Sequence, residues 1–165
     1  METSKILLGK RVLLVDDEKD VLEILIELLS SCKIDTASSF EQAKRLLERN
    51  RYDMAILDIM GVDGFRLLGI ARKRSIPAVM LTAHALNEES LGKSIENGAS
   101  YFVPKDKINE IDVFVADVLE AKERGKNPWS RWLRRLGSTF DAAFTGPEWR
   151  ERQKEFLESI KKAGW

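Results

Sequence analysis

The stretch VLLVDDE, residues 12–18, places four consecutive apolar residues directly before two aspartates and a glutamate. An unbroken apolar run of this length is typical of a strand buried on both faces, as in a parallel sheet covered by helices. Three carboxylates at its end repel one another and are costly to bury without a cation. The stretch therefore predicts both a buried strand and a charged site where that strand ends.

The remainder of the first 124 residues alternates between strand-like and helix-like patterns. The apolar runs predict five strands, at residues 11–15, 34–37, 54–57, 77–81 and 100–103. Between and after them, apolar residues at helical spacing predict five helices, at 18–31, 40–49, 64–73, 87–97 and 107–124. Regular alternation of this kind predicts an α/β fold, a doubly wound parallel sheet with helices on both faces.

Polar residues stand at the ends of four of these strands. Asp16 and Asp17 follow the first strand, Asp58 the third, Thr82 the fourth and Lys105 the fifth. Ligands of open parallel sheets bind beyond these carboxyl ends. Oxygen ligands suit Mg²⁺, and a carboxylate can accept a phosphoryl group. Each residue alone is more commonly a cap, a turn residue or a surface charge, but their joint occurrence at strand ends favours a site.

The charge of the chain is unevenly distributed. Its 165 residues carry no net charge, yet residues 1–121 hold 16 basic and 21 acidic side chains, whereas 122–165 hold 11 and 6. All four tryptophans also lie in the second part, which predicts a boundary near residue 122. A single cysteine, Cys32, fits a reducing compartment, and the chain shows no signal-peptide pattern or membrane-length apolar run. These features predict a cytoplasmic protein.

Residues 10–122 resemble the receiver domain of two-component response regulators. The motifs that carry the resemblance are VLLVDDE (12–18), YDMAILDI (52–59), DGFRLL (63–68), IPAVMLTAH (76–84) and NGASYFVPK (97–105). The resemblance implies a flavodoxin-like sheet with strand order 2-1-3-4-5. It also implies that a sensor histidine kinase or a phosphotransfer protein supplies the phosphoryl group, and that the new charge switches a protein-interaction surface.

The same resemblance implies a role for each residue at the strand ends. Asp58 matches the phosphoacceptor, and Mg²⁺ would be held by Asp16, Asp17, Asp58 and the backbone carbonyl of Met60. Thr82, Phe102 and Lys105 match the residues that bind the phosphoryl group and switch the surface. The protein would then be no enzyme beyond its own phosphorylation and dephosphorylation. The alternative is a constitutive scaffold, a pseudo-receiver acting through its C-terminal helices.

Two features depart from the family pattern. The segment DIMGVDG, residues 58–64, is two residues shorter than the usual sequence after the phosphoacceptor and lacks its proline. We expect a tighter loop that depends on the conformational freedom of Gly61 and Gly64. In the second departure, Pro104 precedes Lys105 rather than following it, so we expect the peptide bond after Lys105 to be trans. His84, the only histidine, is interpreted as a surface-loop residue.

Residues 123–165, called the tail below, are predicted to form a hairpin of two amphipathic helices that begin near Pro128 and Pro147. A hairpin this short is not expected to be stable alone, so its apolar faces must pack against another surface. They could pack on the receiver, on a second copy in a homodimer, or on a downstream protein. A nucleic-acid or membrane role is disfavoured, because acidic residues balance the bases of the second helix. The residues expected to make these contacts are Trp129, Trp132, Leu136, Phe140, Trp149 and Phe156.

Overall fold

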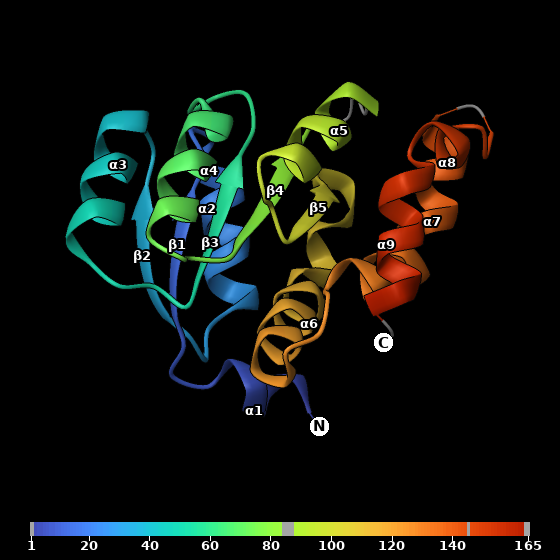
Figure 1. The fold of residues 1–165 in the computed structure, drawn as a ribbon. Helices are drawn as coiled ribbons and strands as arrows, with labels where there is room; N and C mark the ends of the chain where they lie inside the picture. Colours follow the sequence, from blue (N-terminus) through green and yellow to red (C-terminus); the bar gives the residue numbers. More distant parts are fainter. Residues whose placement is uncertain (1, 84–87, 145, 164–165) are drawn as a thin grey trace.

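The five predicted strands form one parallel sheet in a computed structural model that describes residues 2–83, 88–144 and 146–163, with backbone alone for 160–163 (Figure 1). The order is β2-β1-β3-β4-β5, which confirms the flavodoxin-like arrangement. In this register Asp58 pairs with Leu81 and Thr82 with Pro104, so these strands end at nearly the same level. The strands are β1 (Arg11–Val15), β2 (Lys33–Ala37), β3 (Met54–Asp58), β4 (Ala78–Thr82) and β5 (Tyr101–Pro104).

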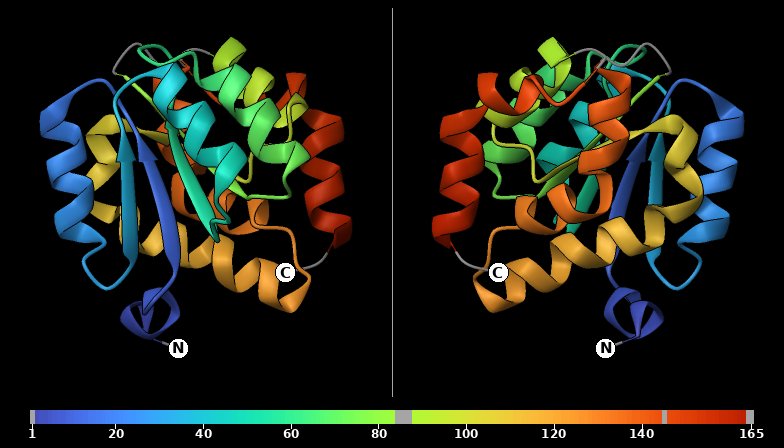
Figure 2. Two further views of the ribbon diagram at one scale, coloured as in Figure 1. Left: turned by 90° about the vertical axis from the view of Figure 1, so that its left-hand side faces the viewer. Right: turned by 90° about the vertical axis from the view of Figure 1, so that its right-hand side faces the viewer.

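Helices cover both faces of the sheet, as the continuous apolar strands require. Right-handed crossovers place α3, α4 and α5 on one face and α2 with α6 on the other (Figure 2). Strands β3 and β4 are buried along their whole lengths, so the core lies between the sheet and these two helical layers. The helices are α2 (Lys19–Leu28), α3 (Phe40–Arg49), α4 (Gly64–Lys73), α5 (Glu88–Glu96) and α6 (Ile111–Arg124).

Two elements at the margins of the receiver differ from the prediction. A short helix that the sequence patterns did not predict, α1 (Thr3–Leu7), precedes the first strand and packs on α6 with Leu7 buried. The last receiver helix also begins later than predicted. Residues Lys105–Glu110 form a 3₁₀ segment, η1, before α6 begins at Ile111. The strand β5 therefore leads directly into a helical turn that starts at Lys105.

The tail consists of three helices rather than two: α7 (Trp129–Ala143), α8 (Trp149–Arg152) and α9 (Lys154–Ala163). The second arm of the predicted hairpin is interrupted at Gln153, where α8 ends and α9 begins. The tail lies alongside β5, the edge strand of the sheet, next to α5 and α6 (Figures 1 and 2). His84 and Trp165 lie outside the described residues. Within the described part of the chain, every helix is too short or too polar to cross a bilayer.

Candidate functional site

Three strands deliver charged side chains to one point at the carboxyl edge of the sheet. Asp16 directly follows β1, Asp58 is the last residue of β3, and Lys105 directly follows β5. The Lys105 ammonium lies 3.0 Å from Asp16 Oδ2 and 3.2 Å from Asp58 Oδ1. Asp16 and Asp58 are almost completely buried, with exposed fractions of 0% and 3%. The parallel register thus brings together residues that are 42 and 47 positions apart in the chain.

Lys105 is the cation that offsets these two buried carboxylates. Burial opposes its charge, but the neighbouring Asp16, Asp58 and Glu18 raise the pKa of the ammonium above its usual range. Burial also raises the pKa of Asp16, and the charge of Asp58 adds to the effect. Asp16 Oδ1 accepts a hydrogen bond from the Glu18 backbone N–H at 2.9 Å. Within the described residues, Oδ2 has only the ion pair with Lys105 and no well-directed hydrogen bond.

A second set of carboxylates borders the buried pair on the solvent side. Ligand oxygens of Asp16, Asp17 and Glu18 lie within 4.8 Å of one another, with Asp17 and Glu18 exposed. Glu18 also contacts Lys105 Nζ at 3.2 Å. Glu18 belongs to the charged cluster predicted from VLLVDDE, but it is not among the predicted metal ligands. Together with Asp58, these residues give the site four carboxylates and one ammonium, and the incompletely bonded Asp16 oxygen makes this oxygen-only site suitable for a hard cation such as Mg²⁺.

The shortened loop after β3 closes tightly over the acidic pair. The Gly61 N–H donates to Asp58 Oδ2 at 3.2 Å. A Cβ on Gly61 would lie 2.2 Å from Asp17 Oδ1, and a Cβ on Gly64 would lie 2.2 Å from the Asp58 carbonyl oxygen. Asp63 takes the left-handed conformation, with φ of 56°. The expectation that these two glycines supply conformational freedom is wrong: they are required for close approach, and an aspartate makes the left-handed turn.

The other predicted site residues occupy different positions around this centre. The Met60 side chain is 80% exposed, so only its backbone could face the carboxylates. Thr82 is buried at the end of β4, next to the strand that carries Asp58. Described residues contain no cis peptide bond, which agrees with a trans bond after Lys105. Phe102 has no exposed surface, because the tail covers it.

The tail satisfies backbone carbonyls along the exposed edge of the sheet. The Trp132 indole N–H donates to the Phe102 carbonyl at 2.7 Å, and the Trp129 indole N–H donates to the Ala99 carbonyl at 3.0 Å. The ring centroids of Phe102 and Phe140 are 5.5 Å apart. An uncovered edge strand invites pairing with other chains, and here α7 supplies the cover. The tail therefore contacts the backbone of β5 as well as its side chains.

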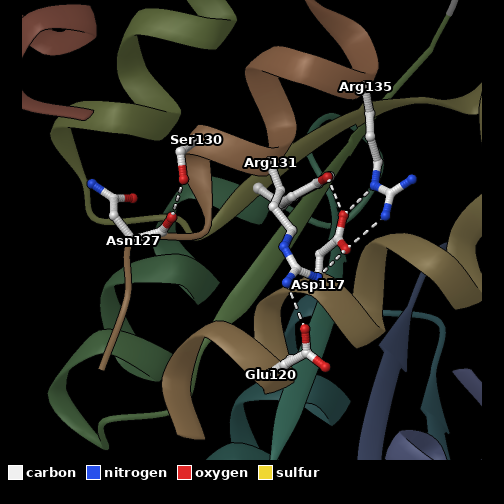
Figure 3. Close-up of polar contacts among 7 residues, drawn as sticks. Asp117, Glu120, Asn127, Ser130, Arg131 and Arg135 are labelled. Carbon is white, nitrogen blue, oxygen red and sulfur yellow. Dashed lines mark hydrogen bonds and ion pairs between the residues drawn. The ribbon is translucent and has the colours of Figure 1, made fainter. Parts of the chain in front are cut away.

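A cluster of charged residues, which we call the latch, joins α7 to α6 (Figure 3). Asp117, which is 2% exposed, accepts hydrogen bonds from Arg135 Nε at 2.5 Å and from Arg131 Nη1 at 3.2 Å. Arg131 also pairs with Glu120 at 2.5 Å. The latch consists of Asp117, Glu120, Arg131 and Arg135. Tyr101 of β5 donates its hydroxyl to Asp117 at 2.8 Å, and burial raises the pKa of that phenol.

The far end of the tail is held separately. Arg152 and Gln153 both donate to Glu88, the first residue of α5, and the Arg152 hydrogen bond lowers the pKa of this carboxyl. Inside the tail, Asp141 accepts from the Trp149 indole at 2.7 Å and from the Arg150 guanidinium at 2.9 Å. Five of the six predicted contact residues are buried, namely Trp129, Trp132, Leu136, Phe140 and Trp149. The sixth, Phe156, is half-buried.

The sheet order, the acidic pair, the aspartate ending β3 and the lysine after β5 together define the receiver class of α/β domains. Comparison with family models agrees: the model of the response regulator receiver domain matches residues 12–116, and the chain belongs to this family. Among curated relatives, the Arabidopsis thaliana two-component response regulator ARR12 is 32% identical over 130 residues, covering 72% of this chain and 22% of that protein. The Staphylococcus aureus heme response regulator HssR is 37% identical over 99 residues, covering 56% and 43%.

Solved structures give the same result. A receiver domain of a Francisella response regulator, 1452, has a TM-score of 0.61 at 25% identity and covers 69% of this chain and 99% of its own. A CheY-like receiver domain from Methanospirillum hungatei has a TM-score of 0.65 at 21% identity, which supports the fold alone. The chain thus spans about a fifth of the plant regulator and under half of the staphylococcal one.

Proposed function

We propose that this protein is a phosphoryl-accepting response regulator whose acceptor is Asp58. The observation that carries the proposal is the placement of the Lys105 ammonium between the buried carboxylates of Asp16 and Asp58. Three carboxylates contact this ammonium and a fourth, that of Asp17, lies beside them, so the site carries a formal surplus of three negative charges, which is costly unless it binds cations. A site with these groups can bind Mg²⁺ and transfer a phosphoryl group.

In the proposed reaction, a carboxylate oxygen of Asp58 attacks the phosphorus of a phosphohistidine on a sensor kinase or phosphotransfer protein. The new P–O bond forms as the P–N bond breaks, and the bonding electron pair leaves with the imidazole nitrogen. Lys105 and the hydroxyl of Thr82 then bind phosphoryl oxygens. Attack by water on the same phosphorus returns Asp58 to a carboxylate and releases inorganic phosphate, so the chemistry is confined to the protein's own acceptor.

Asp16, Asp17, Asp58 and the Met60 carbonyl are the groups we propose to hold Mg²⁺. When bound, the ion would neutralise negative charge that develops on the phosphoryl oxygens. The arrangement of Asp16 supports this assignment, because its Oδ2 has no well-directed hydrogen bond within the described residues. Glu18 stands beside the same oxygens and lowers the local potential further.

We propose that the protein is cytoplasmic and that it passes its signal to another protein rather than to a nucleic acid or a membrane. The charges of the tail support this: Arg131 and Arg135 are engaged by Asp117 and Glu120 and are not presented as a basic stripe. The tail, proposed as a unit distinct from residues 10–122, would pass the signal to a downstream protein or to a second copy in a homodimer. The aromatic residues that it buries would form that surface once uncovered.

The direct test is intact-mass measurement after incubation with acetyl phosphate and Mg²⁺. The wild-type protein should gain one phosphoryl group, and Asp58→Asn should gain none. Omission of Mg²⁺ should suppress labelling of the wild type. Absence of labelling in folded protein with Mg²⁺, using acetyl phosphate and then a phosphorylated histidine donor, would contradict the proposal.

The second candidate is a receiver fold that acts as a constitutive scaffold through its tail. One observation favours it: the short loop presses Gly61 against the Asp17 carboxylate, where a ligand of Mg²⁺ is proposed. This reading predicts weak Mg²⁺ binding and no labelling of Asp58. Calorimetric titration of the folded protein with Mg²⁺ therefore separates the two candidates before any phosphoryl donor is added.

A further inference from the structure

The tail forms hydrogen bonds with β5, which directly precedes Lys105 of the proposed phosphorylation site, and with α5, which follows Thr82 in the chain. Phe102, whose carbonyl accepts the Trp132 hydrogen bond, lies in β5, three residues before Lys105, which directly follows that strand. Glu88, which accepts from Arg152, lies six residues after Thr82 and begins α5. The two groups proposed to bind the phosphoryl oxygens thus sit on segments that the tail holds at their other ends.

The contacts between the tail and β5 can all form only when β5 lies where it does in this structure. The Trp132 and Trp129 indoles reach carbonyls of the edge segment at 2.7 and 3.0 Å, and Tyr101 of the same strand donates to Asp117 in the latch. Trp132 and Phe102 have no exposed surface. Hydrogen bonds of this kind are sensitive to distance and direction. Any shift of β5 along or away from α7 therefore weakens several of them together.

Phosphorylation would change the forces on this strand. Lys105 is now held by Asp16, Asp58 and Glu18 at 3.0 to 3.2 Å. A phosphoryl group on Asp58 adds nearly two negative charges and places its oxygens farther from the aspartate backbone. The ammonium and the Thr82 hydroxyl must move to reach them. Because Lys105 directly follows β5, its movement displaces the strand to which the tail is fitted.

We propose that the docked tail and the phosphorylated state of Asp58 oppose each other, so that phosphorylation loosens α7 from β5 and α6. This inference rests on the proposed function and names its regulation. Coupling between two equilibria is reciprocal, so a weakened tail must in turn favour phosphorylation. The tail then acts as an intramolecular restraint on the receiver, and Arg131, Arg135 and Trp132 are positioning residues that act through β5.

The test uses the full chain and pairs two neighbouring arginines. Arg135→Ala removes a latch residue. Arg134→Ala removes an exposed arginine that forms no hydrogen bond or ion pair with the described residues. Trp132→Phe keeps an aromatic ring but removes the hydrogen bond to Phe102. Acetyl phosphate and Mg²⁺ label each protein, with circular dichroism verifying folding. Backbone hydrogen exchange of residues 129–143 is measured with and without label.

We expect labelled wild-type protein to exchange residues 129–143 faster than unlabelled protein. Arg135→Ala and Trp132→Phe should reach a given labelled fraction at an acetyl phosphate concentration lower by a factor on the order of five, and Arg134→Ala should match the wild type. Unchanged exchange in fully labelled protein, or equal labelling of the Arg135 and Arg134 variants, would overturn the inference alone. Failure of every folded variant to label with any donor would overturn the proposed function and the inference with it.

Discussion

Two carboxylate clusters in this molecule differ in how completely their charges are balanced. At the carboxyl edge of the sheet, Asp16, Glu18 and Asp58 contact the ammonium of Lys105, and Asp17 lies beside Asp16 and Glu18. In the latch, two carboxylates face two guanidiniums, and Asp117 also accepts the Tyr101 hydroxyl. The first cluster keeps a net charge of −3, and the second is neutral.

The difference in charge balance is what we would expect between a cation-binding site and a structural contact. A buried carboxylate with every lone pair satisfied is held in one geometry and has little to gain from a further cation. A carboxylate such as Asp16, with an oxygen bonded only by an ion pair, can gain from a metal. The surplus charge at the sheet edge thus fits the proposed phosphorylation site, whereas the balanced charges of the latch hold α7 on α6.

The largest expected contrast is the response of the two clusters to removal of one charge. Asp117→Asn should destabilise the protein by roughly 2–4 kcal/mol, because it leaves two arginines without their shared partner, a cost reduced by the partial exposure of both arginines. Asp58→Asn should change stability by less than about 1 kcal/mol without Mg²⁺, since it relieves repulsion within a surplus of negative charge. Urea unfolding in EDTA measures both.

Leu136→Val is a control for apolar loss in the same helix, because it removes one buried methylene and no charge. It should cost about 1 kcal/mol, less than Asp117→Asn. Equal destabilisation by Asp117→Asn and Asp58→Asn would show that charge balance does not distinguish the two clusters.

The sequence allowed the placement of the acidic cluster at the sheet edge to be predicted, but not that of the latch. Asp16, Asp58 and Lys105 each follow an apolar run, and parallel strands necessarily align their carboxyl ends, so local pattern and topology together place these side chains. The latch depends on how a separate helix lies on α6, which no local pattern determines. Its only signal was spacing: Asp117 and Glu120 share one face of a helix, as do Arg131 and Arg135.

The loop after Asp58 shows a second limit. Its shortening was visible in the sequence, but the purpose of its glycines was not. Close approach to the Asp17 carboxylate and to the Asp58 carbonyl depends on three-dimensional contacts that a glycine in a sequence cannot reveal. The left-handed residue proved to be Asp63, a residue type that tolerates this conformation better than most.

A smaller effect separates the two glycines of this loop. Gly64→Ala should destabilise the protein by about 1–3 kcal/mol, because the new methyl group meets the rigid Asp58 backbone. Gly61→Ala meets the side chain of Asp17, which can rotate away, so its stability should change less. Its Mg²⁺ affinity should instead fall, since Asp17 is displaced. Thermal unfolding in EDTA and calorimetric Mg²⁺ titration distinguish these outcomes, and an unchanged Mg²⁺ affinity of Gly61→Ala would argue against Asp17 as a ligand.

The smallest expected effect is a difference in acid sensitivity between the tail and the site. Hydrogen bonds from Arg152 and Arg150 lower the pKa values of Glu88 and Asp141, respectively, in the folded protein. The stability that these two carboxylates contribute is therefore present above their unfolded pKa values, near 4. It is lost as the pH falls through their folded pKa values. Asp16 behaves oppositely. Burial raises its pKa, so the folded protein binds this proton more tightly than the unfolded chain, and acidification relieves repulsion at the site.

Below about pH 4, therefore, the tail should loosen while the site is relieved. All four tryptophans lie in the tail sequence, so their fluorescence reports on it, and far-ultraviolet circular dichroism reports on the whole fold. We expect the fluorescence transition to occur at the higher pH, with a small separation because Glu88 and Asp141 are partly exposed and well screened. Asp141→Asn should narrow the separation, since its charge no longer titrates. Coincident transitions in the wild type would mean that the tail and the receiver unfold as one unit in acid, and that their unequal charge balance has no effect on acid stability.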